Sequence, residues 1–451
     1  MQNVKEVFQS LVHILNKKYV HVLIIIIILL LSSATFAWRY FPAFEIPNFY
    51  AEDGKVFVDN VLHKNPLQAI LTAFNGYLIV GLYALVEIAV FLQRLLGLSF
   101  VDLPILLALM SCLFLGLTST LPYILLRKQF GVISTLLMVV ATTLVAVPSF
   151  DYAIIGAIGN LKFLFLLWAF YFILYRNASP YNLKRVIFAD ALLLFSVFTY
   201  APAVALLPFA LWPYRKDLFT FIKKRNFKAL PLGIVSVFTL AFVSFVYLLV
   251  VYVKEIPVLP GYLDTPYQVG ATVKLMYRTT FYGILTPLTG SMRDLITIGL
   301  ILIVSFMGLR WRNTRFITLF GLWSLFIATV AFVANRQGIS NYFMHYGPNP
   351  DQFFYAQTLI FTFLLIVILR RKVNSLSRDG KVITIVLICL LVWWNLPAIG
   401  SYGKNRALYE HLGTSQTNIE TACKTQTGKY INFQIYPSAE WRWTIERSMA
   451  C

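Results

Sequence analysis

Hydrophobic and polar positions alternate along this chain in long blocks, not in the short periods of a soluble protein. Apolar stretches of roughly 17 to 25 residues recur from Leu23 to Ile399. At about 1.5 Å per residue, each is long enough to cross a hydrocarbon core about 30 Å thick. The pattern predicts an all-α polytopic membrane protein.

Short runs of Lys and Arg separate the apolar stretches, as in loops on the cytoplasmic face of a membrane. These runs fall at 5–18, 127–128, 176–185, 215–228, 310–315 and 370–381. If they share one side, the stretches between them form pairs: 131–148 with 160–175, 186–199 with 202–214, 231–253 with 295–309, and 316–334 with 353–369. Adding 20–37, 103–126 and a last stretch at 382–399, we expect about eleven transmembrane helices, with the N-terminus inside and the C-terminus outside.

The stretch at 70–97 does not fit this pairing, because it would add a second crossing between the first span and the basic run at 127–128. Turn-forming and charged residues interrupt it, namely Asn75-Gly76, Gly81, Glu87, Gln93 and Arg94. We therefore assign it to the outer surface as a juxtamembrane helix or a re-entrant segment. The alternative, in which it crosses the membrane and the basic pair 127–128 lies outside, stays open.

This topology divides the chain into a transmembrane domain at 1–400 and a polar outer tail at 401–451. Within the first, residues 39–102 form the first outer loop, and a turn before Pro202 splits a long apolar run into a hairpin. Most of the sequence outside the bilayer lies on the outer side. Any chemistry is therefore expected there.

Composition agrees with this class and removes one alternative. Of the 451 residues, 59% are hydrophobic and 13% charged, with a net charge of +19, whereas soluble domains are about half apolar and a quarter charged. The basic residues lie in short runs between apolar stretches and not on a separate polar domain. The charge is therefore a topology signal and does not indicate a nucleic-acid partner.

An acidic pair just beyond the first span is the sharpest chemical signal. Glu52 and Asp53 stand beside a glycine and Lys55, and could supply a general base or a cation ligand. A solvated acidic turn is the alternative. Asp151 is a second carboxylate on the same outer face, although it could equally cap a helix.

Basic and aromatic residues occur together in the outer segments. A sequence of this kind suits a lipid phosphate and a sugar ring, or ordinary anchoring at the membrane interface. The candidate phosphate-binding and substrate-binding residues are Lys55, Tyr77, Lys162, Arg278, Arg293, Arg336 and His345.

The four cysteines fall into two groups. Cys112 and Cys389 lie inside apolar stretches, whereas Cys423 and Cys451 lie in the polar tail. Because disulfides form outside the cytosol, outer placement of the tail predicts a Cys423–Cys451 bond.

Nucleotide hydrolysis, zincin chemistry and serine hydrolysis lack their usual motifs here. The sequence contains no GxxxxGK[ST], HExxH or GxSxG pattern. It also offers no cytoplasmic domain for a soluble nucleotide sugar, so an activated substrate would arrive through the lipid phase.

In order and sidedness, residues 20–228 resemble the GT-C superfamily of membrane glycosyltransferases, which take sugars from polyprenyl-phosphate carriers. The similar features are an acidic first outer loop, a juxtamembrane segment, a second acidic turn and a proline-bearing hairpin. They correspond here to Glu52-Asp53-Gly54, Asn75-Gly76-Tyr77-Leu78, Asp151 and Tyr200-Ala201-Pro202. Size and polar tail are similar to the bacterial O-antigen glucosyltransferases of serotype-converting phages.

The resemblance implies transfer of a sugar, with glucose the first candidate, from undecaprenyl phosphate to lipopolysaccharide O-antigen, at the periplasmic face of the bacterial inner membrane. It implies Glu52 or Asp53 as base or metal ligand, helped by Asp151. Either inversion or retention of configuration is open. No cofactor is certain; Mg²⁺ or Mn²⁺ could be held by Asp53 and Asp151, but the family's Asp-x-Asp pair is absent at the second turn.

Two other functions remain as alternatives. A transporter or flippase of lipid-linked sugars would place ionisable residues deep within its spans, whereas Asp190 is the only acidic residue inside an expected span, which favours catalysis at the membrane interface. An O-antigen polymerase would carry its largest, basic outer loop in the middle of the chain.

Overall fold

In the computed structural model, the residues described are 18–74, 77–145, 155–224, 231–254, 276–277, 280, 290–335, 351–375, 414–435 and 442–451. They are mostly helical. Within these ranges, five helices are long and apolar enough to cross a membrane: Tyr19–Arg39, Phe100–Phe130, Leu232–Val251, Ser291–Arg310 and Arg312–Val330. The fold is thus consistent with a helical membrane protein. The total of about eleven spans and the sidedness of the termini stay predictions, and the expected span at 382–399 lies outside the described residues.

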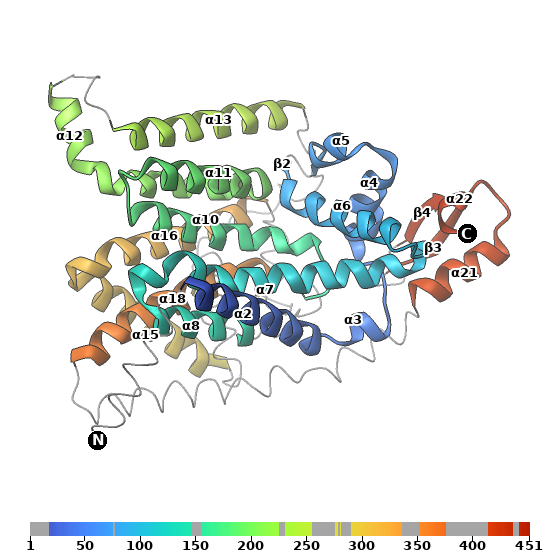
Figure 1. Cartoon of the computed structure of the whole chain (residues 1–451), viewed down its shortest axis with the longest axis horizontal. Coiled ribbons are helices and arrows are strands. Elements are labelled where there is room, and N and C mark those ends of the chain that lie inside the picture. Colours follow the sequence, from blue (N-terminus) through green and yellow to red (C-terminus); the bar gives the residue numbers. More distant parts are fainter. Residues whose placement is uncertain are drawn as a thin grey trace.

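The long helices of this region run roughly side by side (Figure 1). Helix α2 (Lys18–Arg39) packs along α7 (Leu103–Phe130), and α7 packs on α8 (Val132–Leu144). Small residues permit the first contact, because a Cβ added to Gly116 would overlap the hydroxyl of Ser33. Close approach through small residues is a common packing device between membrane helices.

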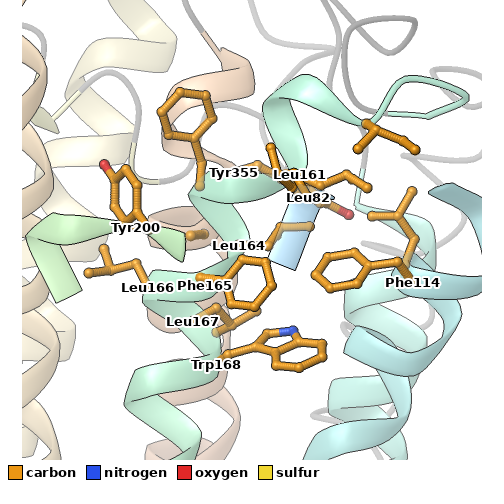
Figure 2. Packing of buried hydrophobic residues seen from close by; sticks show 14 of the residues in the cluster. Leu82, Phe114, Leu161, Leu164, Phe165, Leu166, Leu167, Trp168, Tyr200 and Tyr355 are labelled. Carbon is orange, nitrogen blue, oxygen red and sulfur yellow. The ribbon is translucent and has the colours of Figure 1, made fainter. Parts of the chain in front are cut away.

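Helix α10 (Phe165–Asn177) lies at the centre of the array and follows the 3₁₀ helix η3 (Gly159–Leu164). Nearly all of its side chains are buried, against α7, α11 (Leu183–Thr199), η4 (Ala201–Tyr214) and α18 (Asp351–Ser375). In Figure 2 its rings meet Phe114 of α7, whose centroid lies 5.3 Å from that of Phe165 and 5.0 Å from that of Trp168. A helix that is apolar on every side belongs in the interior of a bundle.

The turn expected before Pro202 is present. Helix α11 ends at Thr199, and the 3₁₀ helix η4 begins at Ala201 and contains Pro208 and Pro213. Proline lacks an N–H donor, which disfavours a regular α-helix here. At about 2.0 Å per residue, the 14 residues of η4 extend about 28 Å, close to the thickness of a bilayer core.

Among the described residues, four further helices belong to this region. Helix α12 (Arg215–Lys224) follows η4 and precedes α13 (Leu232–Lys254), which packs on α11 and η4. Helices α15 (Gly290–Arg310) and α16 (Arg312–Asn335) pack together, and both contact α18.

The expected first outer loop folds into several short elements. In chain order they are α3 (Pro42–Glu45), the π-helix η1 (Asp53–Val58), α4 (Asp59–His63), α5 (Pro66–Ile70), β1 (Ala73–Phe74), β2 (Tyr77–Leu78), α6 (Val80–Leu95) and the 3₁₀ helix η2 (Phe100–Asp102). The two strands are antiparallel, with Phe74 opposite Tyr77.

This segment returns to the place where it starts. The ring of Phe49, after α2, lies 5.3 Å from the ring of Phe100, which precedes α7. Helix α6, with 16 residues, packs on α7 and α11. The segment therefore begins and ends at the same end of the helices, as expected for a juxtamembrane or re-entrant segment.

The C-terminal tail adds strands that the all-α prediction did not contain. It consists of α21 (Ser415–Thr425), the antiparallel strands β3 (Tyr430–Gln434) and β4 (Arg442–Glu446), and α22 (Arg447–Ala450). Alternate residues such as Ile431, Phe433 and Trp443 are buried on one face, which is the period of a strand. A disulfide joins Cys423 to Cys451, the expected pairing.

A buried ion pair connects four elements near the basic runs that begin at Arg176 and Arg215. We call this end of the helices the basic end. The Arg176 side chain is fully buried, and its Nε lies 2.7 Å from Oδ1 of Asp190. The same guanidinium donates to the carbonyl oxygens of Ala210 and Gly233 and to the hydroxyl of Ser236. One cation thus links α10, α11, η4 and α13.

Loss of either ion-pair partner is expected to destabilise the fold. Arg176→Ala or Asp190→Ala leaves a buried charge unpaired, which costs about 3–5 kcal/mol. Unfolding by sodium dodecyl sulfate in detergent micelles measures the change. Arg312→Gln is the control, because Arg312 is exposed and such changes cost within about 0.5 kcal/mol. Equal stability of all three variants would contradict the prediction.

Candidate functional site

Backbone strain marks the segment that carries the acidic pair. Ala51 has a φ of 32°, in the left-handed region that residues other than glycine rarely adopt. The π-helix η1 begins two residues later at Asp53. Single-turn π-helices and strained residues both concentrate at functional sites, where surrounding packing maintains them. This segment is therefore the first place to look for chemistry.

Asp53 connects η1 to the segment that precedes α10. Its Oδ2 accepts the backbone N–H of Ile158 at 2.7 Å, and its Oδ1 accepts the N–H of Gly159 at 2.7 Å. The side chain is only 1% exposed. A Cβ on residue 159 would lie 3.0 Å from Oδ1, so the glycine permits this close approach.

Burial raises the pKa of Asp53 from 3.8 to about 7. The negative charge of Glu52 also raises this pKa, whereas the two backbone donors and the positive charge of Lys162 lower it. Burial is the largest cause because a carboxylate loses its hydration there. A carboxyl group with such a pKa changes charge near neutral pH, which is a property of groups that take part in proton transfer.

Lys162 lies in η3, close enough to Asp53 for its charge to affect that pKa. The side chain is 5% exposed, and Nζ lies 5.1 Å from the ring centroid of Phe74 and 5.4 Å from that of Phe163. Such distances allow cation–π attraction. The expected lysine thus lies beside the expected acid.

The β1–β2 hairpin contributes the ring over this lysine. Phe74 also packs edge-to-face on Phe57 of η1, with centroids 5.4 Å apart. Tyr77 pairs with Phe74 in the hairpin, so its main chain lies next to the residue that packs on Lys162. The side chain of Tyr77 is not among those that the structure describes. The hairpin, η1 and η3 therefore meet around Asp53 and Lys162.

The three charged residues of the acidic segment differ in exposure. Asp53 is buried, Glu52 is half-buried and Lys55 is exposed. One turn therefore presents an acid to the interior, a second acid at the boundary with solvent, and a cation to solvent.

Of the remaining expected site residues, the structure describes the position of Arg293 alone. Asp151, Arg278, Arg336 and His345 lie outside the described residues. Arg293 lies in the first turn of α15, whose main packing partners are α16 and α18. These contacts do not place Arg293 beside Asp53.

In the described part of its surroundings, Asp53 is bound by the main chain, and a metal ion held by Asp53 and Asp151 stays a prediction because Asp151 lies outside the described residues. Both carboxylate oxygens already accept backbone N–H groups. Among the residues described, no group of three or more His, Cys, Asp or Glu could hold a metal ion. In this conformation Asp53 acts as an acceptor of hydrogen bonds.

The C-terminal tail contacts the acidic segment on both of its flanks. Upstream, the Ser415 hydroxyl accepts the N–H of Phe49 at 2.9 Å and donates to Oδ1 of Asn48 at 2.7 Å. Downstream, Nε1 of Trp443 donates to Oδ1 of Asp59 at 3.1 Å. Tail and acidic segment are thus one packed unit, which Figure 1 shows at the end of the molecule far from α12.

The Trp443 ring also packs directly on the acidic segment. It packs edge-to-face on Phe49 at 5.0 Å, and a Cβ added to Gly54 would lie 3.1 Å from it. The sequence pattern predicts neither these contacts nor the binding of Asp53 by the N–H groups of Ile158 and Gly159. In the sequence, Gly54 and Gly159 were the available signal of these contacts, because each allows a close approach that a side chain would block.

The stability of the protein should depend on pH through Asp53. Because its pKa is higher in the folded state, the folded form binds more protons between about pH 4 and pH 7, and stability falls as pH rises through that window. A shift of about 3 units corresponds to at most about 4 kcal/mol. Unfolding free energies of wild type and Asp53→Asn, measured at several pH values in detergent, should diverge across this range. Parallel curves would contradict the raised pKa.

Loss of the tail contacts should loosen the acidic segment. Trp443→Ala removes a buried ring and is expected to cost about 3–5 kcal/mol, and Cys451→Ser removes a disulfide worth about 2–4 kcal/mol. Hydrogen exchange of peptides covering residues 47–59 should rise in both variants. Tyr430→Ala, which removes an exposed ring from β3, is the control. Unchanged exchange in Trp443→Ala would show that the tail does not hold this segment.

Comparison with protein-family models and with curated proteins finds no match for this chain. Its function is therefore inferred from its residues and their geometry.

Proposed function

We propose that the protein transfers a sugar from a polyprenyl-phosphate carrier to a lipopolysaccharide O-antigen, at the periplasmic face of a bacterial inner membrane. Glucose is the first sugar to test. The observation that carries this proposal is the meeting of the acidic pair with Lys162 at the end of the helices that the tail covers. A lipid-linked donor would reach this place from the surrounding membrane.

The two acids have different parts in the proposed reaction. Glu52 is half-buried at the boundary with solvent, so an acceptor hydroxyl could reach it. Asp53 is buried and uses both oxygens to bind backbone N–H groups. We therefore assign the general base to Glu52, and to Asp53 the positioning of η1 against η3.

The proposed reaction forms and breaks one bond at the anomeric carbon. Glu52 takes the proton of the acceptor hydroxyl, and the oxygen attacks the anomeric carbon. The bond to the phosphate oxygen breaks, and polyprenyl phosphate leaves with the electron pair. Lys162 would stabilise the negative charge on that phosphate, and no general acid is required because phosphate is a good leaving group.

The competing transport function has less support. Transport would require ionisable residues within the spans, and the one acid expected there, Asp190, is the ion-pair partner of Arg176. That pair joins helices and accounts for the acid as a structural group. Buried charged groups in membranes are commonly paired in this way.

Transfer of radiolabelled sugar from a polyprenyl-phosphate donor to lipopolysaccharide tests the proposal. Loss of a general base is expected to lower the rate by about 10²- to 10⁴-fold in Glu52→Gln. Asp53→Asn should lower transfer as well, and it should also shift the pH profile, because its pKa lies near 7. Membranes must contain equal amounts of folded protein.

Asp217→Asn is the matched control, since Asp217 is a carboxylate at the opposite, basic end and contacts Tyr181. Transfer should be unchanged in this variant. Full activity in Glu52→Gln would remove the assignment of the base. Absence of transfer by wild type with several sugars would overturn the proposed reaction and leave transport as the function to test.

A further inference from the structure

Helix α12 has two faces of different chemistry. Phe219 and Ile222, three positions apart, lie on one face and are 69% and 70% exposed. Lys216 and Lys223 lie on another and are also exposed, with Thr220 between them. Spacings of three and seven residues place each set on one side of a helix, and Phe219, three residues after Lys216 and four before Lys223, lies where the two faces adjoin. Two large apolar side chains are thus uncovered beside a row of ammonium groups.

The position of α12 places it close to the membrane boundary. It follows η4 directly and ends a few residues before α13, a helix long and apolar enough to span the bilayer. In Figure 1 it lies at the end of the molecule away from the tail and runs across the direction of α11 and α13. With 10 residues, the helix is too short to cross a bilayer core.

Specific contacts hold α12 in this orientation. The Tyr181 hydroxyl, in the turn before α11, donates to Oδ2 of Asp217 at 2.9 Å. At the start of the helix, the Arg215 guanidinium donates to the carbonyl of Trp212 at 3.0 Å. The helix is therefore fixed to the bundle, and its apolar residues stay uncovered.

We propose that α12 lies in the headgroup layer of the membrane and binds anionic phospholipid. Phe219 and Ile222 enter the acyl boundary, and Lys216 and Lys223 contact the negatively charged headgroups. An amphipathic helix with Lys beside large apolar residues is the usual form of an interfacial helix. Opposite charge argues for an anionic lipid surface as the occupant, because α12 carries Arg215, Lys216, Lys223 and Lys224 against Asp217.

The proposal is independent of sugar transfer and can be tested by fluorescence quenching in reconstituted vesicles. Phe219→Cys is prepared in a Cys389→Ser background and labelled with an environment-sensitive fluorophore. Cys112 is buried and the tail cysteines form a disulfide, so the label reacts at position 219. Brominated phosphatidylglycerol and brominated phosphatidylcholine are compared as quenchers at equal mole fractions.

Brominated phosphatidylglycerol is expected to quench this label more strongly than brominated phosphatidylcholine. Each basic residue near the surface contributes about fivefold in lipid affinity. Lys216→Gln with Lys223→Gln should therefore remove most of the preference, and high salt should weaken it in the unaltered helix. A label at Phe242→Cys, on the exposed side of α13, should be quenched equally by both lipids.

Two results would overturn the proposal. No quenching at position 219 by either lipid would mean that the Phe219 and Ile222 face of α12 contacts water or another protein and not lipid. Equal quenching by both lipids, unaffected by the lysine substitutions, would mean that α12 lies in the membrane without binding anionic headgroups.

Discussion

A charge removed from water must find its partners within the protein, and this constraint organises both ends of the molecule. At the basic end, Arg176 satisfies it through Asp190 and two backbone carbonyls, and in doing so joins four elements. Near the other end, buried Arg39 donates to the carbonyls of Thr143 and Val145 and so covers the end of α8. Asp53 satisfies the same requirement with backbone N–H groups. Each buried charged residue therefore also connects two or more elements.

Asp53 differs from the two arginines in having a charge that can change. Burial raises its pKa to about 7, so protonation alters the connection between η1 and η3 near neutral pH. The tail adds a second support to the same segment through Ser415 and Trp443. A strained backbone at Ala51 can persist in such a setting because contacts on both sides maintain it.

The two ends of the helices thus have separate properties. One end brings together an acidic pair, a buried lysine and a disulfide-bonded tail, which is the chemistry we assign to sugar transfer. The other end carries basic residues and the two-faced helix α12, which we assign to the lipid surface. Helix α10 lies in the interior, where Phe165 and Trp168 pack on Phe114 of α7 (Figure 2).

The sequence by itself determined the class of protein, because long apolar stretches and basic runs depend only on the chemistry of a bilayer. It also located the acidic segment, the break before Pro202 and the pairing of the tail cysteines, since each depends on local residue types or on which side of the membrane they lie. Only the tertiary structure decided that Asp53 is bound by backbone N–H groups, that Lys162 lies beside it, and that Trp443 supports the segment from the tail. These contacts join residues up to nearly 400 positions apart. No local pattern encodes them, because they depend on how the helices pack.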